Sequence, residues 1–271
     1  MHILALNLPS LLLDLWRGKM PVKHPDNKAT WVWAVLQGDT WEAHGKSVAD
    51  ATPYLPGSFD RPPRNPAEKI SSGYKAWEFL TYLFFLGPGL LYGVLPDPYY
   101  RNFCKLVRAV RILHQRRIAK DELLIAHRFI VDFIQEFEEI YYQCKTKRIH
   151  FCQPILHILL HLTPMVHTLG PPCYYTQWTM ERMIGNLTEE MKQPSLPFAN
   201  LAQRGLRQAQ VNALKVMMPN LQKDEKNPRG SQDIGDGYIL LHAHDKVMRT
   251  LRMAIEALLF LFLLCSAGKT T

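Results

Sequence analysis

Residues His157–Leu187, HILLHLTPMVHTLGPPCYYTQWTMERMIGNL, form the stretch around which the rest of the chain is expected to fold. A histidine-bearing apolar segment comes first, followed by the break Gly170-Pro171-Pro172 and by an aromatic segment that leads to Glu181. Because glycine and proline interrupt helices, the pattern predicts one helix on each side of the break. The apolar segments upstream have helical spacing, and we expect them to pack around this stretch.

Two histidines in this stretch are candidate metal ligands. His157 and His161 are four residues apart, so on a helix their rings can converge on one ion such as zinc, with Cys152 nearby in the sequence. The spacing lacks the glutamate that a metalloprotease motif places between its histidines, so no general base accompanies them. Metal binding and burial of both rings among satisfying neighbours remain the two interpretations.

Glu181 is the carboxylate of greatest interest in this stretch. It lies among apolar neighbours, and such surroundings disfavour the charged form unless an arginine or a metal ion compensates. A carboxylate of this kind can hold a metal ion, or it can form an ion pair with Arg182 or Lys192 and take no part in chemistry. The residues alone leave both interpretations open.

A basic stripe precedes the central stretch. Asp97-Pro98 opens a predicted helix whose apolar residues share one side, while basic residues recur at i, i+4 and i+7 and continue beyond its end. Their spacing suits contact with nucleic-acid phosphates, although a charged helix face can also be merely solvated. The candidate DNA-binding residues are Arg101, Lys105, Arg108, Arg111, Arg116 and Arg117.

Composition restricts the class of protein. The chain has 271 residues, of which 47% are hydrophobic and 21% charged, so it can bury a core and is not disordered by composition. Its net charge of +8 favours anionic partners. The five scattered cysteines argue against a disulfide framework. We therefore expect a nuclear or cytoplasmic protein that is not secreted.

The remaining segments predict a mainly α-helical, bundle-like body. The opening run His2–Leu6 favours a strand, which limits β structure to at most a vestigial N-terminal strand pair. Residues 51–73 contain five prolines and two glycines and are expected to be a loop. Residues 238–264 read as a leucine-rich helix, a candidate site for a partner helix or homo-oligomer. The uncharged run 257–268 is shorter than the about 20 residues of a spanning helix, so membrane insertion is not expected.

As an ordered set, several segments resemble the C-terminal part of transposases of fungal mobile elements. These are of the CACTA (En/Spm) and Kyakuja-Dileera-Zisupton kind. The resemblance covers about residues 1–220. It rests on LNLPSLLLDLWRG, the run from KATWVWAVLQGDTW to WEFLTYLF, GVLPDPYYRNFCKLVRAVRIL, HFCQPILHILLHLTPMVHTLGP and QWTMERMIGNL.

The resemblance implies an RNase H-like core with a helical insertion, in which two aspartates and a glutamate hold Mg²⁺ for strand transfer. Glu181 matches the glutamate, whereas the two aspartates would precede Met1. The expectation is therefore an inactive fragment with weak, sequence-nonspecific DNA binding and no cofactor of its own. The alternative is a helical protein-interaction module. The expected parts are a core remnant with helices (1–50), a Pro-rich loop (51–73), a transposase-derived helical domain (74–218), a polar linker (219–237) and an apolar helix (238–271).

Overall fold

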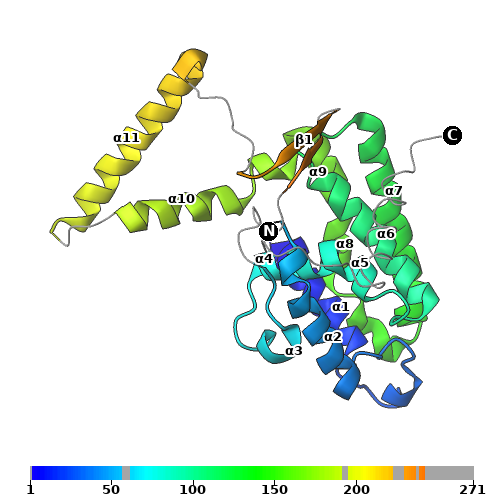
Figure 1. Cartoon of the computed structure of the whole chain (residues 1–271). Helices are drawn as coiled ribbons and strands as arrows, with labels where there is room; N and C mark the ends of the chain where they lie inside the picture. The colour runs from blue at the N-terminus through cyan, green and yellow to red at the C-terminus, as the bar shows by residue number, and fades with distance from the viewer. Residues whose placement is uncertain (1, 57–61, 191–194, 222–228, 236–237, 242–271) are drawn as a thin grey trace. The chain divides into compact units, whose positions relative to one another are not determined.

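The computed structural model describes residues 2–56, 62–190, 195–221, 229–235 and 238–241 (Figure 1). Over these residues the chain is mainly helical, with one two-stranded antiparallel sheet, as the sequence predicts for the fold class. The chain forms two compact units. Unit 1 contains the described residues up to Cys173, and unit 2 runs from Tyr174 to Leu241.

The elements of unit 1 include short 3-10 or π segments, labelled η, between α-helices. In order they are η1 (Ile3–Asn7), α1 (Leu8–Trp16), η2 (Lys28–Thr30), α2 (Gly38–Asp50), η3 (Thr52–Tyr54), α3 (Pro66–Lys69), α4 (Ala76–Phe79), η4 (Leu80–Leu86), α5 (Gly87–Leu90), α6 (Asp97–Leu113), α7 (Lys120–Phe137), η5 (Glu138–Tyr142), η6 (Thr146–Phe151), α8 (Pro154–Leu159) and α9 (Leu162–Leu169). The short segment η7 (Pro172–Tyr174) contains the boundary between the units. Unit 2 comprises α10 (Gln177–Glu190), α11 (Pro197–Met217), η8 (Pro219–Leu221), β1 (Gln232–Gly235) and β2 (Tyr238–Leu240).

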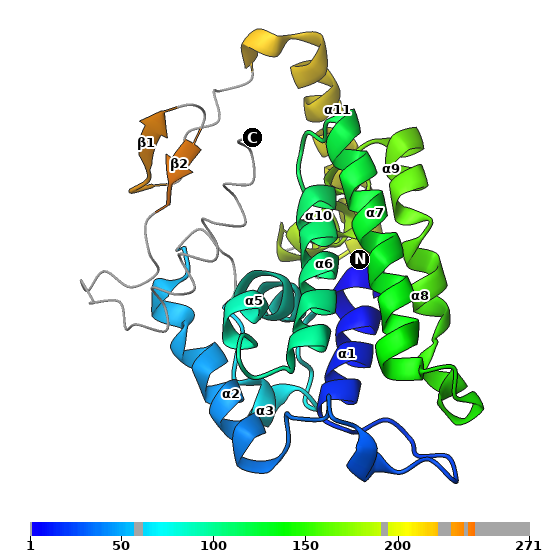
Figure 2. The same ribbon diagram turned by 90° about the vertical axis from the view of Figure 1, so that its right-hand side faces the viewer.

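The core of unit 1 lies among α1, α6 and α7, which run side by side with α8 (Figure 2). Trp16 of α1 is fully buried and donates a hydrogen bond from Nε1 to the Tyr141 hydroxyl at 2.9 Å. The ring of Trp33 packs against Tyr99 and Tyr141 with centroids 5.7 and 5.4 Å apart. Aromatic side chains of this size bury large apolar areas, so this cluster contributes much of the stability of unit 1.

The strand expected at the N-terminus is wrong, and with it the vestigial N-terminal strand pair. Ile3–Asn7 forms a π-helical turn that continues into α1, and the amide of Leu8 donates to the carbonyl of Ile3. A lone strand would leave its backbone groups unpaired, whereas a helical turn satisfies them locally. A short apolar run fits either structure by pattern. The sheet lies instead in unit 2, where Gln232 pairs with Leu240.

The prediction of a leucine-rich helix at 238–264 is also wrong for its first residues. Tyr238–Leu240 is strand β2, and its partner β1 lies within the expected polar linker 219–237. Residues 242–264 lie outside the described part of the chain.

In the proline-rich stretch 51–73, the described residues 51–56 and 62–73 form no continuous helix, as predicted, and they pack within unit 1. The Asn65 side chain accepts a hydrogen bond from the amide of Ala67 at 2.9 Å and caps α3. A Cβ atom added at Gly45 of α2 would lie 2.2 Å from Asn65 Oδ1, so glycine permits this approach. Arg64 binds the buried Glu78 carboxylate through Nε at 2.7 Å and Nη2 at 2.8 Å. These contacts attach the stretch to α2 and α4.

Candidate nucleic-acid interface

Helix α6 is strongly amphipathic and is anchored in the core by its apolar face. Phe103, Leu106 and Val110 are buried, as the periodicity predicts. The buried Asn102 donates from Nδ2 to the backbone carbonyl of Phe133 in α7 at 2.9 Å. With the apolar face fixed against α7, the basic residues of α6 have to lie on its remaining surface.

Lys105 and Arg111, which the sequence assigns to DNA binding, bind groups on other elements of unit 1. Lys105 of α6 forms an ion pair with Glu136 of α7 and is only partly exposed. Arg111 donates from Nε to the backbone carbonyl of Phe84 at 3.1 Å, at a helical segment whose last carbonyls lack intrahelical partners. Both side chains therefore stabilise the packing of α6.

Arg101 and Arg108 differ in exposure. Arg101 is 75% exposed and forms an ion pair with Asp97 at 2.8 Å, one helical turn away. Exposed pairs of this kind contribute about 0–1 kcal/mol, so the guanidinium can readily exchange Asp97 for a phosphate. Arg108 is half-buried.

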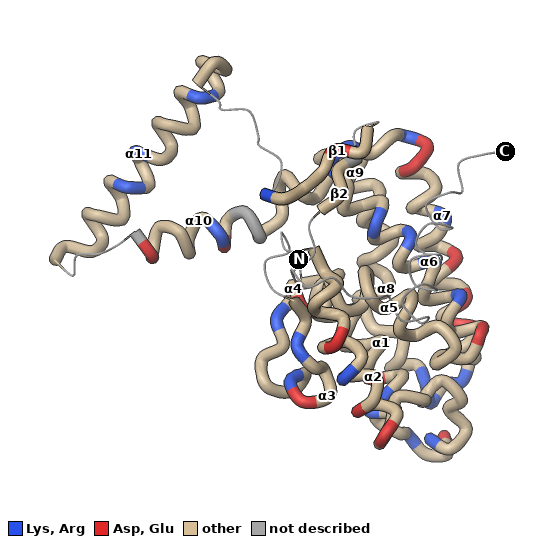
Figure 3. Tube along the Cα trace, viewed as in Figure 1, with Lys and Arg blue, Asp and Glu red and all other residues tan. Residues whose placement is uncertain are grey.

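Further exposed basic residues lie at the junction of α6 with α7; Figure 3 colours lysine and arginine blue along the Cα trace. Arg116 and Arg117 are exposed in the turn after α6, and Lys120 is exposed at the first position of α7. We refer to Arg116, Arg117 and Lys120 as the basic corner. Lys120 was not among the predicted residues, although no acidic residue occurs between Pro98 and Lys120. The continuous absence of acidic residues is the signal that could have found it.

Acidic residues begin immediately after the basic corner. Asp121 and Glu122 occupy the first turn of α7, and Glu122 accepts a hydrogen bond from the amide of Ala119 at 3.1 Å. Carboxylates at this position stabilise a helix N-terminus. The capping role orients Glu122 toward the backbone, but both charges reduce the positive potential of the corner.

The predicted metal-ligand residues lie in different units. Glu181 is exposed on α10 in unit 2. His157 and His161 are exposed in unit 1, with their Nε2 atoms 3.2 Å apart, so the predicted convergence of the rings is present and the alternative of buried rings is wrong. Within the described residues, no group of three or more His, Cys, Asp or Glu side chains could hold a metal ion.

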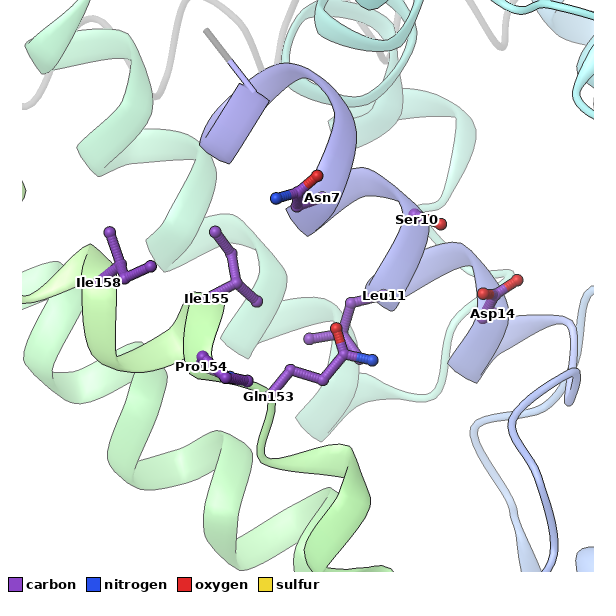
Figure 4. Close-up of a pocket in the computed structure, with 8 residues that line it drawn as sticks. All are labelled: Asn7, Ser10, Leu11, Asp14, Gln153, Pro154, Ile155 and Ile158. Carbon is purple, nitrogen blue, oxygen red and sulfur yellow. The ribbon is translucent and has the colours of Figure 1, made fainter.

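A surface pocket of about 400 Å³ lies between the N-terminal helices and α8 (Figure 4). Its lining consists of Asn7, Ser10, Leu11 and Asp14 on one side and Gln153, Pro154, Ile155 and Ile158 on the other. Asp14 is the one ionisable group of this lining, and burial raises its pKa. A single carboxyl group does not supply the paired carboxylates of a two-metal site. The basic residues of α6 and α7 are therefore a better candidate functional site than this pocket.

A second buried charge of unit 1, besides Glu78, was not predicted from the sequence. The Arg148 side chain is 1% exposed and binds Asp26 through Nε at 2.8 Å and Nη2 at 2.7 Å. Its Nη1 donates to Gln143, and its guanidinium lies 5.1 Å from the Trp33 ring centroid. The hydrogen bonds from Arg148 lower the pKa of Asp26 to about 2. The two residues are 122 positions apart, so no local spacing could pair them.

Comparisons with known proteins gave no match: no family model, no curated protein and no solved structure is detectably similar to this chain. None of the helices in the described ranges has both the length and the hydrophobicity needed to cross a membrane. The four cysteines within those ranges, Cys104, Cys144, Cys152 and Cys173, are free thiols.

Proposed function

We propose that this chain is a transposon-derived helical protein that binds nucleic acid through the phosphate backbone at the basic corner of unit 1. The observation that carries the proposal is the stretch Pro98–Lys120, which contains seven basic residues and no acidic one and ends in three exposed basic side chains. The ordered resemblance to helical insertions of RNase H-like transposases supports the same class of partner.

The contacts and exposure of each basic residue indicate whether it stabilises the fold or is available to bind DNA. Lys105 and Arg111 bind groups of the protein itself, so their neutralisation would weaken the fold as well as any DNA contact. Arg116, Arg117 and Lys120 are exposed at the end of the basic stretch, so their side chains can reach a phosphate in solvent. The binding energy is assigned mainly to these three, with Arg101 as an additional contact.

Contacts of this kind carry no sequence information, because phosphates are the same at every base pair. Binding is therefore expected to be weak, nonspecific and strongly dependent on salt. If three phosphates are neutralised, the logarithm of the association constant should fall with the logarithm of salt concentration with a slope of about −2.7 for duplex DNA.

The test is fluorescence anisotropy of a labelled DNA duplex at several salt concentrations. The triple variant Arg116→Gln, Arg117→Gln, Lys120→Gln should bind at least about tenfold more weakly and show a salt slope that is smaller in magnitude by about 2.7. The matched control Lys46→Gln, Lys69→Gln, Lys75→Gln removes the same charge from exposed sites elsewhere in unit 1 and should retain binding. Equal losses in both variants would reduce the effect to net charge and refute the proposed site.

A second candidate is a helical protein-interaction module, and the exposed apolar face of α11 favours it. Phe198, Leu206 and Val216 are 84%, 59% and 76% exposed, which is unusual for large apolar side chains that recur on one helix. The leucine-rich run 238–264 is the other candidate contact. A change of oligomeric state on deletion of residues 238–271, combined with DNA binding that is absent at every salt concentration, would favour this module over the nucleic-acid protein.

A further inference from the structure

We propose that His157 and His161 form a divalent transition-metal site, of the kind that Zn²⁺, Ni²⁺ or Cu²⁺ occupies, on the surface of unit 1. The two Nε2 atoms lie 3.2 Å apart, and the ring planes are inclined by 77°. Two nitrogens bound to one tetrahedral ion at about 2.05 Å each lie about 3.3 Å apart. The observed separation therefore matches adjacent ligand positions around a single ion.

Contacts with the core of unit 1 and with α7 hold the backbone of His157 and His161 in place. His157 is on α8, whose Leu156 and Leu159 are buried in the core. His161 is the N-cap of α9, and α9 is attached to α7 by a hydrogen bond of 2.7 Å between Thr163 Oγ1 and His127 Nδ1. Rigid support of this kind reduces the loss of freedom when a metal binds, because the ligands are already positioned.

The two rings gain little from each other without an ion. Both side chains are exposed, so water can satisfy either ring, and the net contribution of a hydrogen bond that competes with water is small. A bound ion would replace this contact with two metal–nitrogen bonds, since each neutral imidazole has one nitrogen that can act as a ligand.

The imidazole ligands also determine which metal ions the pair can bind. Imidazole nitrogens suit zinc, copper and nickel and discriminate against magnesium and calcium, which prefer oxygen ligands. No third protein ligand accompanies the pair within the described residues, so water fills the remaining positions. The site is consequently open and exchangeable, unlike a structural zinc site with four protein ligands.

Isothermal titration calorimetry of the full chain with Ni²⁺ tests the proposal. The wild type should bind one ion that His157→Ala and His161→Ala each weaken by at least about tenfold, since even the loss of an outer-shell partner commonly costs about 10–100-fold. The matched control is His167→Ala, which removes another exposed histidine, on α9, and should leave this binding unchanged.

Thiols are alternative ligands, and a second measurement separates them from the histidines. Co²⁺ bound at the imidazole pair should absorb in the visible range without a thiolate-to-cobalt charge-transfer band, and the signal should disappear in His157→Ala. Wild-type affinity in both His157→Ala and His161→Ala would overturn the proposal. A cobalt spectrum with thiolate character that persists in those variants would also overturn it.

Discussion

The two compact units differ in the burial of their polar and apolar side chains. In unit 1 the charged Arg148 is 1% exposed and fully supplied with hydrogen-bond partners, whereas in unit 2 the aromatic Phe198 is 84% exposed. At these two positions the type of residue therefore does not decide burial. What decides it is whether the fold brings a partner from elsewhere in the chain.

The difference has an energetic consequence. In unit 1 water is largely excluded from the Arg148–Asp26 pair, so the loss of one partner leaves the other unsatisfied. In unit 2, none of the residues of α11 is buried, and helices with so little tertiary burial are expected to open locally at low free energy. Substitutions should accordingly have large effects in unit 1 and small effects in unit 2.

The largest effect is expected when the buried ion pair is broken. Asp26→Ala leaves the Arg148 guanidinium buried without its carboxylate and should lower the free energy of unfolding by about 3–5 kcal/mol. The matched control is Asp97→Ala, which breaks the exposed pair with Arg101 and should cost about 0–1 kcal/mol. Urea unfolding followed by tryptophan fluorescence measures both. Similar costs for the two variants would show that the contrast between buried and exposed pairs does not hold.

An effect of intermediate size is expected from acid, through His44. This residue is 6% exposed, its Nε2 lies 2.8 Å from the Tyr82 hydroxyl, and burial lowers its pKa from 6.5 to about 4. Between these two values the unfolded chain takes up a proton that the folded chain does not. Stability should therefore fall as the pH drops from about 6.5 to about 4, by about 3 kcal/mol in total from this residue.

Unfolding in urea at pH 7, 6, 5 and 4.5 tests this expectation. His44→Phe should remove the contribution, so the stability difference between the variant and the wild type should shift in favour of the variant as the pH falls. A pH profile that runs parallel to that of the wild type would contradict a neutral, buried His44.

The elements that could be predicted from the sequence are those with local causes. The apolar spacing of α6 predicted its buried face because helical periodicity is a property of neighbouring residues. The approach of His157 and His161 was predicted from one continuous helix, on which residues four apart share a face. The approach is present, although α8 ends at Leu159 and His161 is the N-cap of α9.

The features that escaped prediction depend on distant partners. Lys105 was assigned to DNA, but its ion pair with Glu136 bridges 31 positions and depends on how α6 packs on α7. His2–Leu6 was predicted as a strand because a short apolar run carries no decisive period, and the conformation is set by its continuation into α1. Charge and hydrophobicity thus indicated the class of element, while the packing decided what each side chain contacts.

The smallest effect is expected on α11, where a leucine can be compared with its counterpart on α6. Leu106 of α6 is 0% exposed, and Leu106→Ala should cost about 2–5 kcal/mol of unfolding free energy. Leu206 of α11 is 59% exposed, and Leu206→Ala should change the free energy by less than about 0.5 kcal/mol. Urea unfolding of both variants, at two protein concentrations, makes the comparison.

A large loss of unfolding free energy in Leu206→Ala would contradict the difference in burial between α6 and α11. It would mean that the apolar face of α11 is covered in solution. If the cost grows with protein concentration, a second copy of the chain covers the face, because association contributes to stability by mass action. If the cost is independent of concentration, the covering segment belongs to the same chain, and residues 242–264 become the first segment to delete.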